Sequence, residues 1–390
     1  MGMRRWLLCV ALLVAGTGIE RARAGSVFEP LGDLAGGVFD SRAYGVSPSG
    51  EWIVGESRSA SGREAFRWSE STGIQGLGDL VLGLFDSVAY DVANDGRASG
   101  YATDAIGRIA TRWEAPGSIT VLGDLPGGPR FSVAFGISAD GRVIAGQASP
   151  PGGYAEAFRW VEGVGMVGLG DLPGGSPLSV ALAISADGST VVGWSSSANG
   201  REAFRWTPTD GMIGLGDLPG ATFTSEARGV SPDGRYVVGY GKAAGTVTAG
   251  FIWSAATGMI DVGHLGTAVR WTQALDVSDT GVVVGWSVTG TVFDSRRAFV
   301  WDATAGIRDL KTVLQTDYGV SLTGWTLLEA TGISRDGTVI AGWGVNPAGN
   351  IEAFRVHLAP IPTPSTYLLW SIGLATATAA KQWRRRFART

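Results

Sequence analysis

Short runs of apolar residues, separated by polar turns, recur along most of the chain in a fixed order. One round of this pattern reads EAFRWT, GMIGLGDL, ARGVS and RYVVGY, within residues 202–240. Each run is a few residues long, rich in β-branched or aromatic residues and bounded by Gly, Pro, Asp or Ser, as is typical of β-strands. Ser231-Pro232-Asp233-Gly234 and Thr209-Asp210-Gly211 fit tight hairpin turns, in which Gly takes a positive φ. Helical spacing is absent, so the pattern predicts an all-β chain of antiparallel hairpins.

Through the sixth repeat the runs recur every 45 to 48 residues, and the last step, which includes the insertion, is 55 to 57 residues. LGDL begins at Leu31, Leu77, Leu122, Leu169 and Leu215, with VGHL at Val262. The A-x-G-V-S run begins at Ala43, Ala89, Ala134, Ala181, Ala227, Ala274 and Ala330, and V-V-G and A-F-R-W keep the same period. Four antiparallel strands per repeat of this length predict the blade of a β-propeller, and seven copies predict a seven-bladed one. The alternative for such a repeat is a parallel β-solenoid.

The two ends of the repeat array complement each other. The last repeat stops after its third strand, EAFRVHL, whereas an isolated fourth-strand sequence, VFEPLGDL, precedes the first repeat at Val27–Leu34. We expect this N-terminal strand to complete the last blade, because ring closure removes exposed sheet edges. The predicted blades span residues 41–80, 87–125, 132–172, 179–218, 225–265, 272–310, and 328–358 plus 26–34.

These repeats resemble the HAF-repeat family of exported bacterial proteins. The resemblance rests on seven units of A-F-x-W, L-G-x-L and A-x-G-I-S-x-x-G over roughly residues 26–358. The His that gives the family its name is replaced here by Glu64, Glu156 and Glu202, and by Arg297 in the sixth copy. The resemblance implies an extracytoplasmic, propeller-like protein and brings no established activity.

The first 24 residues read as a signal peptide. Arg4 and Arg5 precede an apolar stretch at 7–18, and Ala22-Arg23-Ala24 provides a small-residue cleavage site before Gly25. The only cysteine, Cys9, lies in this segment. The mature chain is therefore expected to lack disulfides and thiolate chemistry.

The last residues, 359–390, read as a sorting or anchoring tail. A Pro-rich segment, PIPTPST, precedes an apolar run at 367–380 and the basic sequence KQWRRRFART. This arrangement resembles the PEP-CTERM sorting signal of Gram-negative exported proteins, which a membrane transpeptidase is thought to process. The matching motif is Pro362, Thr363, Pro364 and Ser365, with Thr363 in place of the family's Glu. The alternative is a plain C-terminal membrane anchor, its basic end on the cytoplasmic side.

Removing both terminal segments makes the remaining body acidic. The whole chain carries −4, the signal +3 and the tail +5, which leaves about −12 on residues 25–358. This charge argues against nucleic acid as a partner. It suits an exported domain held at the cell surface or released from it.

Candidates for chemistry are few. The mature chain has two histidines, His264 and His357, both at repeat positions, and no His or Cys cluster has metal-ligand spacing. No catalytic residues, metal or cofactor are therefore predicted. Asp91 and Asp276 break the pattern, because the other repeats have Gly or Ala at this place in the first strand. If this position lines the channel, the two carboxylates could serve glycoside chemistry. The competing interpretation, which we favour, is that each carboxylate binds backbone amides.

Aromatic residues suggest a binding face. Phe39, Phe85, Phe131, Phe223 and Trp271 lie just before first strands, in connections expected to share one face of the ring. Such rings can stack on sugars or partner side chains, or instead fill the gaps between blades. The one long insertion, Lys311–Glu329, adds Tyr318 and Trp325 as further candidates.

The sequence thus predicts an exported propeller that acts as a non-catalytic binding or structural module, with envelope polysaccharide as the expected partner. A carbohydrate-active enzyme using Asp91 and Asp276, and a scaffold for protein partners, are the alternatives. Export machinery and a sorting transpeptidase would be further partners.

Overall fold

A computed structural model describes residues 25–359, except residues 82, 221, 245–247, 268 and 292–294. The predicted signal peptide and nearly all of the predicted tail, including the Pro362–Ser365 motif, lie outside the described residues. Residues Val27–His357 form one compact unit. Along the described part of the chain there are 28 β-strands and one helix, which confirms the predicted all-β class.

Five four-stranded antiparallel sheets follow one another along the chain. The first two contain β6 (Val88–Val92), β7 (Ala98–Thr103), β8 (Arg108–Ala115) and β9 (Ser118–Gly123), then β10 (Ser132–Ile137), β11 (Val143–Ala148), β12 (Glu156–Val161) and β13 (Gly165–Gly168). The third contains β14 (Gly174–Ile184), β15 (Val191–Ser197), β16 (Gly200–Thr207) and β17 (Gly211–Gly214). The last two contain β18 (Ser225–Val230), β19 (Val237–Gly241), β20 (Ala249–Ser254) and β21 (Gly258–Asp261), then β22 (Thr272–Val277), β23 (Val283–Val288), β24 (Arg296–Asp302) and β25 (Gly306–Asp309).

A sixth sheet joins the two ends of the repeat array. It contains β26 (Thr326–Ile333), β27 (Val339–Val345), β28 (Ile351–His357) and β1 (Val27–Gly32), together with β2 (Gly36–Val46), β3 (Ile53–Ser59), β4 (Gly62–Ser69) and β5 (Gly73–Gly76). Strand β1 pairs antiparallel with β28, as the isolated N-terminal strand sequence predicts. The two halves of this sheet meet only at one parallel pair, Asp40 with Ile351.

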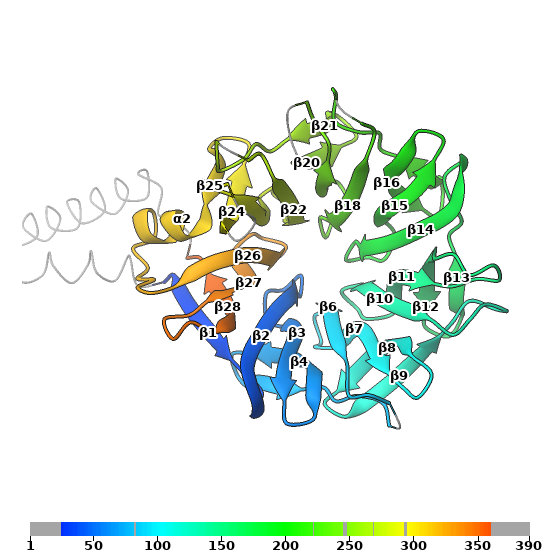
Figure 1. Ribbon diagram of the computed structural model, residues 1–390, viewed down its shortest axis with the longest axis horizontal. Helices are drawn as coiled ribbons and strands as arrows, with labels where there is room; N and C mark the ends of the chain where they lie inside the picture. Colours follow the sequence, from blue (N-terminus) through cyan, green and yellow to red (C-terminus); the bar gives the residue numbers. More distant parts are fainter. Residues whose placement is uncertain are drawn as a thin grey trace, which may run out of the picture. The chain divides into compact units, whose positions relative to one another are not determined.

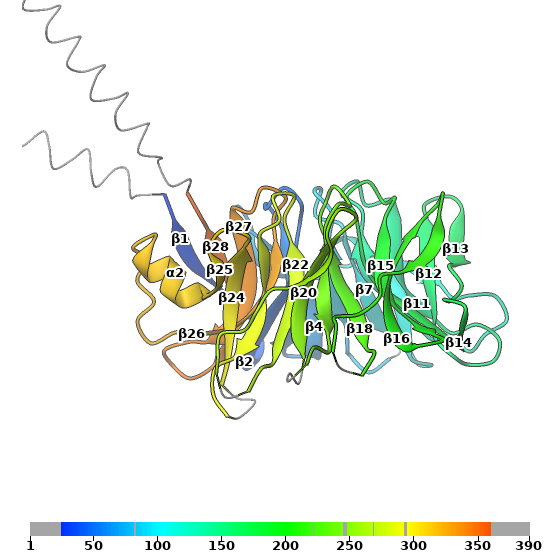
Figure 2. The same ribbon diagram turned by 90° about the horizontal axis from the view of Figure 1, so that it is seen from above.

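The sheets stand around a central opening, with β2, β6, β10, β14, β18, β22 and β26 innermost (Figure 1). This radial arrangement of antiparallel sheets is the architecture of a β-propeller. Figure 2 shows that β2, β14 and β26 extend toward the same side of the ring. We call this side, which carries connections such as 124–131 and hairpins such as 197–200, the crossing face. The opposite side, which carries turns such as Ser138–Gly141, is the turn face.

The glycine of the V-V-G run is required by close packing of neighbouring strands. A Cβ atom on any of these seven glycines would lie 1.9 to 2.1 Å from a backbone oxygen of the inner strand; the glycines are Gly55, Gly100, Gly146, Gly193, Gly239, Gly285 and Gly342. No side chain can occupy that position unless the two strands separate. The repeated glycine is thus a packing requirement of the sheet.

We expect Gly193→Ala to lower the unfolding free energy by roughly 2–4 kcal/mol, because the new methyl group would collide with the Val180 carbonyl. Chemical denaturation monitored by tryptophan fluorescence measures this change. Val167→Ala, at a side chain that is 57% exposed, is the control and should change stability little. Equal stability of both variants would contradict the packing argument.

In five repeats a buried serine ties the repeat to the one before it. The hydroxyl of Ser132 accepts from Ala110 N (3.0 Å) and donates to Gly123 O (2.8 Å), both in the preceding repeat. Ser87, Ser179 and Ser225 make the same pair of bonds. Ser41 repeats the motif across the chain ends, where it accepts from Ala353 N of β28 and donates to Gly32 O of β1. The junction of the chain ends is therefore built like an internal one.

The turns of the turn face form a closed circle of hydrogen bonds. Backbone N–H groups of Asn94, Ala139, Ala186, Asp279 and Arg335 donate to carbonyls of Ala139, Ala186, Pro232, Arg335 and Pro48, respectively. At the two remaining junctions a side chain accepts instead, since Ser49 N donates to Asn94 Oδ1 and Asp233 N to Asp279 Oδ1. The circle passes through all seven repeats.

The core between sheets is built on the phenylalanine of the third strand. Phe66, Phe158, Phe204, Phe251, Phe299 and Phe354 are fully buried. Around Phe204, the core includes Val191, Ala181 and the half-buried Trp206. Phe204 and Trp206, two residues apart on one strand, therefore share its core-facing side.

The insertion contains a helix that the sequence pattern did not predict. Helix α2 (Leu310–Thr316) begins at Asp309, whose carboxylate caps it by accepting from Thr312 N. Its apolar residues Leu310, Val313 and Leu314 are buried. Their i, i+3, i+4 spacing spans barely two turns, too short to stand out beside the long β pattern. Among residues 25–359, outside the gaps given above, no helix is long and apolar enough to span a membrane.

Candidate functional site

The centre of the ring holds a cavity of about 300 Å³. All seven inner strands or their following turns contribute to its wall. The residue after the repeated alanine of each A-x-G-V run lines it in all seven repeats; these residues are Tyr44, Tyr90, Phe135, Leu182, Arg228, Leu275 and Thr331. Because this position differs from repeat to repeat, a nearly symmetric scaffold encloses an asymmetric space.

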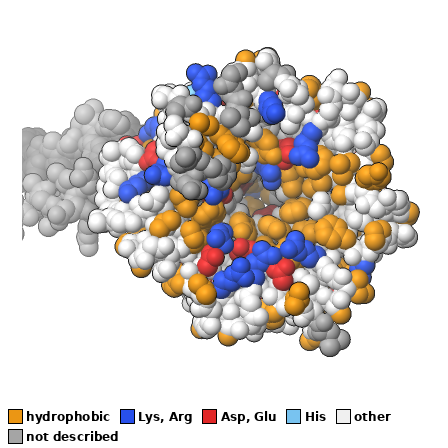
Figure 3. Space-filling view, viewed as in Figure 1, with side chains coloured by type: hydrophobic (Ala, Val, Ile, Leu, Met, Phe, Trp, Pro, Cys, Tyr) orange, Lys and Arg blue, Asp and Glu red, His pale blue; other side chains and the backbone are white. Residues whose placement is uncertain are grey.

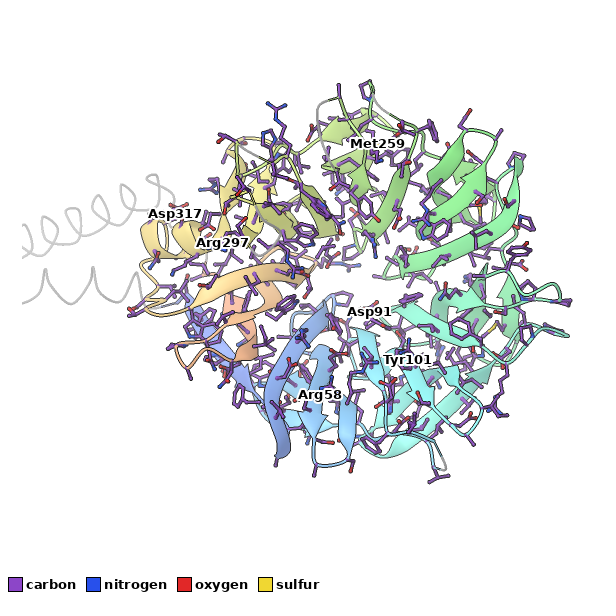
Figure 4. The ribbon with its side chains drawn as sticks, viewed as in Figure 1. Arg58, Asp91, Tyr101, Met259, Arg297 and Asp317 are labelled. Atoms are coloured by element: carbon purple, nitrogen blue, oxygen red, sulfur yellow. The ribbon has the colours of Figure 1, made fainter. Side chains whose placement is uncertain are left out.

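Asp91 and Asp276 border this cavity, and each joins two inner strands. Asp91 accepts from Val92 N (2.8 Å) in its own strand and from Ile137 N (2.9 Å) in the next repeat. Asp276 accepts in the same way from Val277 N and Ile333 N, both at 2.8 Å. Figure 4 places Asp91 beside the central opening. Both carboxylates therefore bind backbone amides, as we favoured from the sequence.

Close packing between inner strands also explains why four of the other repeats have Gly at this position. A Cβ on Gly229 would lie 2.5 Å from Leu275 O, so this position packs against the next inner strand. Burial raises the pKa of Asp91 to about 7, against the effect of its two backbone hydrogen bonds. Burial also raises the pKa of Asp276 to about 7, and the charge of Asp91 contributes.

One side of the cavity is aromatic. Tyr90 stands at the centre of this group, with ring centroids 5.7 Å from Tyr44, 5.0 Å from Phe135 and 6.2 Å from Tyr101. Burial raises the pKa of Tyr44 and Tyr90, so both phenols stay neutral. Neutral rings with hydroxyl groups suit a ligand that has both apolar faces and polar edges.

Arginines stacked on aromatic rings surround the cavity mouth on the crossing face. The Cζ of Arg201 lies 3.9 Å from the Trp194 ring centroid, and that of Arg108 lies 4.4 Å from Tyr101. Arg228 over Tyr240, Arg296 over Trp286 and Trp343, and Arg42 over Trp343 are separated by 5.3 to 5.5 Å. Charged and hydrophobic side chains are seen together beside the central opening (Figure 3). We call these arginine–aromatic pairs, together with Arg63 over Tyr101 at 6.0 Å, the mouth belt.

Three largely buried glutamates hold the mouth belt together. Glu56 pairs with Arg42 and Arg63, both at 3.3 Å. Glu226 pairs with Arg201 and with Arg228 (3.3 Å), and Glu329 pairs with Arg296. Burial raises the pKa of Glu329, while Arg296, Arg42 and Arg228 act to lower it. The glutamates fix the guanidinium planes, as a preorganised polar site requires.

The sequence pattern did not lead to a prediction of the mouth belt, although the sequence contains a feature that marks it. The residue after V-V-G is aromatic in five of seven repeats: Tyr101, Trp194, Tyr240, Trp286 and Trp343. From the sequence alone, V-V-G indicates only a strand. Its closing glycine packs against the inner strand, and the next residue is directed to the mouth belt.

The aromatic residues expected on the crossing connections occupy separate environments. Phe39 is 38% exposed, and Phe85 and Phe223 are half-buried. Phe131 packs against the cluster of Val88, Tyr101 and Val133. The Trp271 ring centroid lies 5.9 Å from that of Trp286, with the two planes tilted by 51°. Two of the five candidates thus adjoin the mouth belt.

The two candidates from the insertion differ in exposure. Tyr318, just after α2, is half-buried. Trp325 is 7% exposed and its ring meets Phe28 of β1 edge-on at 5.0 Å. Lys311 Nζ also donates to Trp325 O (2.7 Å). Trp325 therefore helps to hold β1 against the last repeat.

No metal site is found in the part of the chain that the structure describes, since no three His, Cys, Asp or Glu side chains converge there. His264 and His357 are both half-buried at repeat positions.

No family model matches the chain, and no curated protein matches it. Among solved structures, TolB from Acinetobacter baumannii is similar at 13% identity with a TM-score of 0.46. That match covers 80% of this chain, and this chain spans 64% of TolB. The β-propeller domain of the Trilobed protease from Pyrococcus furiosus matches at 13% identity and TM-score 0.44, over 73% of this chain and 86% of that one. A gluconolactonase from Xanthomonas campestris matches at 14% identity and TM-score 0.38, over 86% and 90%. TM-scores below 0.5 support no transfer of activity.

Proposed function

We propose that this protein is a non-catalytic, saccharide-binding seven-bladed propeller, exported and held at or released from the cell surface. In a seven-bladed ring the eight-stranded sheet corresponds to two blades, β26–β27–β28–β1 and β2–β3–β4–β5. Its single parallel pair, Asp40 with Ile351, has counterparts between other repeats, at Arg63 with Asp86 and Arg201 with Thr224. The HAF-like repeats, signal peptide and sorting tail support export.

The observation that carries the binding role is the cavity mouth itself. It combines aromatic rings, arginine donors and glutamate acceptors around a space at the lower end of small-molecule pocket volumes. Sugars present apolar ring faces together with hydroxyl groups that both donate and accept hydrogen bonds. The mouth belt offers a counterpart for each.

The enzyme alternative receives less support from the same geometry. A glycosidase requires one carboxylate to protonate the leaving group and another to activate water or attack. Asp91 and Asp276 instead accept backbone hydrogen bonds on both oxygens. A protein-interaction scaffold remains the second alternative, since the same face could receive a peptide loop.

The test follows retention and released reducing ends together, using the full-length protein and a panel of bacterial envelope polysaccharides. We expect retention without release. Trp194→Ala should weaken retention at least about tenfold, because the stacked ring and the position of Arg201 are lost together. A variant that combines Phe39→Ala, Phe85→Ala and Phe223→Ala distinguishes binding at the mouth belt from binding at the connections of the crossing face. Release of reducing ends would refute the non-catalytic role, and no retention on any polysaccharide would refute saccharide binding.

A further inference from the structure

The mouth belt is not uniform, and its fifth-repeat portion differs in charge. There, the buried Glu226 faces two arginines, Arg201 from β16 and Arg228 from its own strand β18. Elsewhere in the belt, Arg296 faces Glu329, and Arg42, Arg63 and Arg108 face Asp40, Glu56 and Asp86. The Arg201–Glu226–Arg228 group therefore carries one more positive than negative charge, and Glu329, which lines the same cavity, is the further carboxylate that acts on Arg228.

Arg228 also has unused hydrogen-bonding capacity. It lines the central cavity, and its ion pair with Glu226 and hydrogen bond with Tyr240 (3.4 Å) both use Nη2. Within the described residues, its Nε is buried and has no partner. A buried N–H without an acceptor is destabilising, so such a group marks a place where an acceptor is missing.

The two arginines are held in position before any ligand arrives. Arg201 stacks on Trp194 and Arg228 on Tyr240, while Glu226, only 4% exposed in its side chain, binds both. Stacking and ion pairing fix the plane of a guanidinium group, and a fixed guanidinium presents parallel N–H donors. Two oxygen atoms in one plane, as in a carboxylate, match this geometry.

We propose that Arg228, with Arg201, Trp194 and Tyr240, forms a subsite for the carboxylate of an acidic sugar, a uronic acid unit of the bound saccharide. This proposal rests on the saccharide-binding function above. The carboxylate accepts from Arg228 and neutralises the extra charge, while the sugar ring lies against the aromatic rings. Because the body of the protein carries about −12, general attraction for polyanions is absent and recognition depends on this local group.

The experiment compares one oligosaccharide in two forms: a glucuronate-containing tetrasaccharide, and the same molecule with its carboxyl groups reduced to alcohols. Calorimetric titration of the full-length protein should show at least about tenfold tighter binding of the acidic form. Arg228→Gln should remove this preference and leave the weaker binding of the reduced form. Arg142→Gln, on the turn face with a side chain that is 68% exposed, is the matched control and should retain the preference.

Each outcome decides a separate question. Equal affinity for the two forms in the unmodified protein would overturn the carboxylate subsite and leave saccharide binding intact. A preference that survives Arg228→Gln would also overturn it, by placing recognition elsewhere. Failure of both forms to bind, together with failure across the polysaccharide panel, would refute the proposed function itself. If Arg228→Gln does not fold, Arg228→Lys, which keeps the charge but not the planar fork, should bind the acidic form with a reduced preference.

Discussion

Deletion of Val27–Leu34 is expected to lower the melting temperature by roughly 10 °C or more. The deletion removes β1 from the edge of β28, exposes unpaired backbone groups, and removes Phe28 from its contacts with Trp325 and Phe354. It also takes away Leu31, which is 4% exposed. Differential scanning calorimetry of the full-length protein and the deletion variant measures the change.

Two controls make this test specific to ring closure. Val27→Ser, at the exposed end of the same strand, should leave the melting temperature nearly unchanged. Ser41→Ala and Ser132→Ala should each lower the free energy of unfolding by roughly 1–3 kcal/mol. The two decreases should be similar, because each substitution removes the same pair of hydrogen bonds. Two results would show that the chain ends are not joined like internal repeats. One is an unchanged melting temperature after the deletion. The other is a free energy of unfolding that Ser41→Ala leaves unchanged and Ser132→Ala lowers strongly.

The second large effect concerns pH. We expect the unfolding free energy to fall as pH rises from about 4 to about 7, because Asp91 and Asp276 have a pKa near 7 in the folded protein and near 3.8 when unfolded. In that window the folded state binds more protons than the unfolded state, so raising the pH favours unfolding. The expected loss is on the order of several kcal/mol for the two groups together.

Substituting both residues by alanine should flatten this part of the pH profile. Alanine fits the position, since Ala183 occupies it in the fourth repeat. Asp140→Ala is the control, because hydrogen bonds from Ser138 and Arg142 lower the pKa of Asp140 despite partial burial, so it titrates below the window. Urea denaturation at closely spaced pH values from 4 to 8 provides the profiles. An unchanged slope in the double variant would contradict the assignment.

Much of the architecture could be predicted because the sequence consists of repeats, each of which forms the same group of strands. The period, the strand order and the pairing of Val27–Gly32 with the last strand all follow from the recurring sequence runs. These runs reflect the residues required at turns and the alternation of apolar and polar residues along each strand. The backbone role of Asp91 and Asp276 could also be anticipated, since a carboxylate in the place of glycine must find donors nearby.

The site was harder to predict, for a physical reason. The alternation of side chains along a strand indicates which residues share a face. It does not indicate which of the two faces is directed to the channel after a bulge. Each inner strand of the repeats breaks register after its alanine, as between Ala227 and Gly229, and this places Arg228 in the cavity wall. The pairing of Arg201 with Glu226 joins different repeats, so no spacing within one repeat reveals it. Helix α2 escaped because its apolar spacing is too short to be recognised alone.

The central claim is that ligands bind at the cavity mouth on the crossing face. Hydrogen–deuterium exchange of the full-length protein, with and without the glucuronate tetrasaccharide, tests it most directly. We predict slower exchange in β18, which carries Arg228, and at the start of β16, which carries Arg201, with no change in the turn Ser138–Gly141. Protection confined to the turn face, or none anywhere at saturating ligand, would contradict the account.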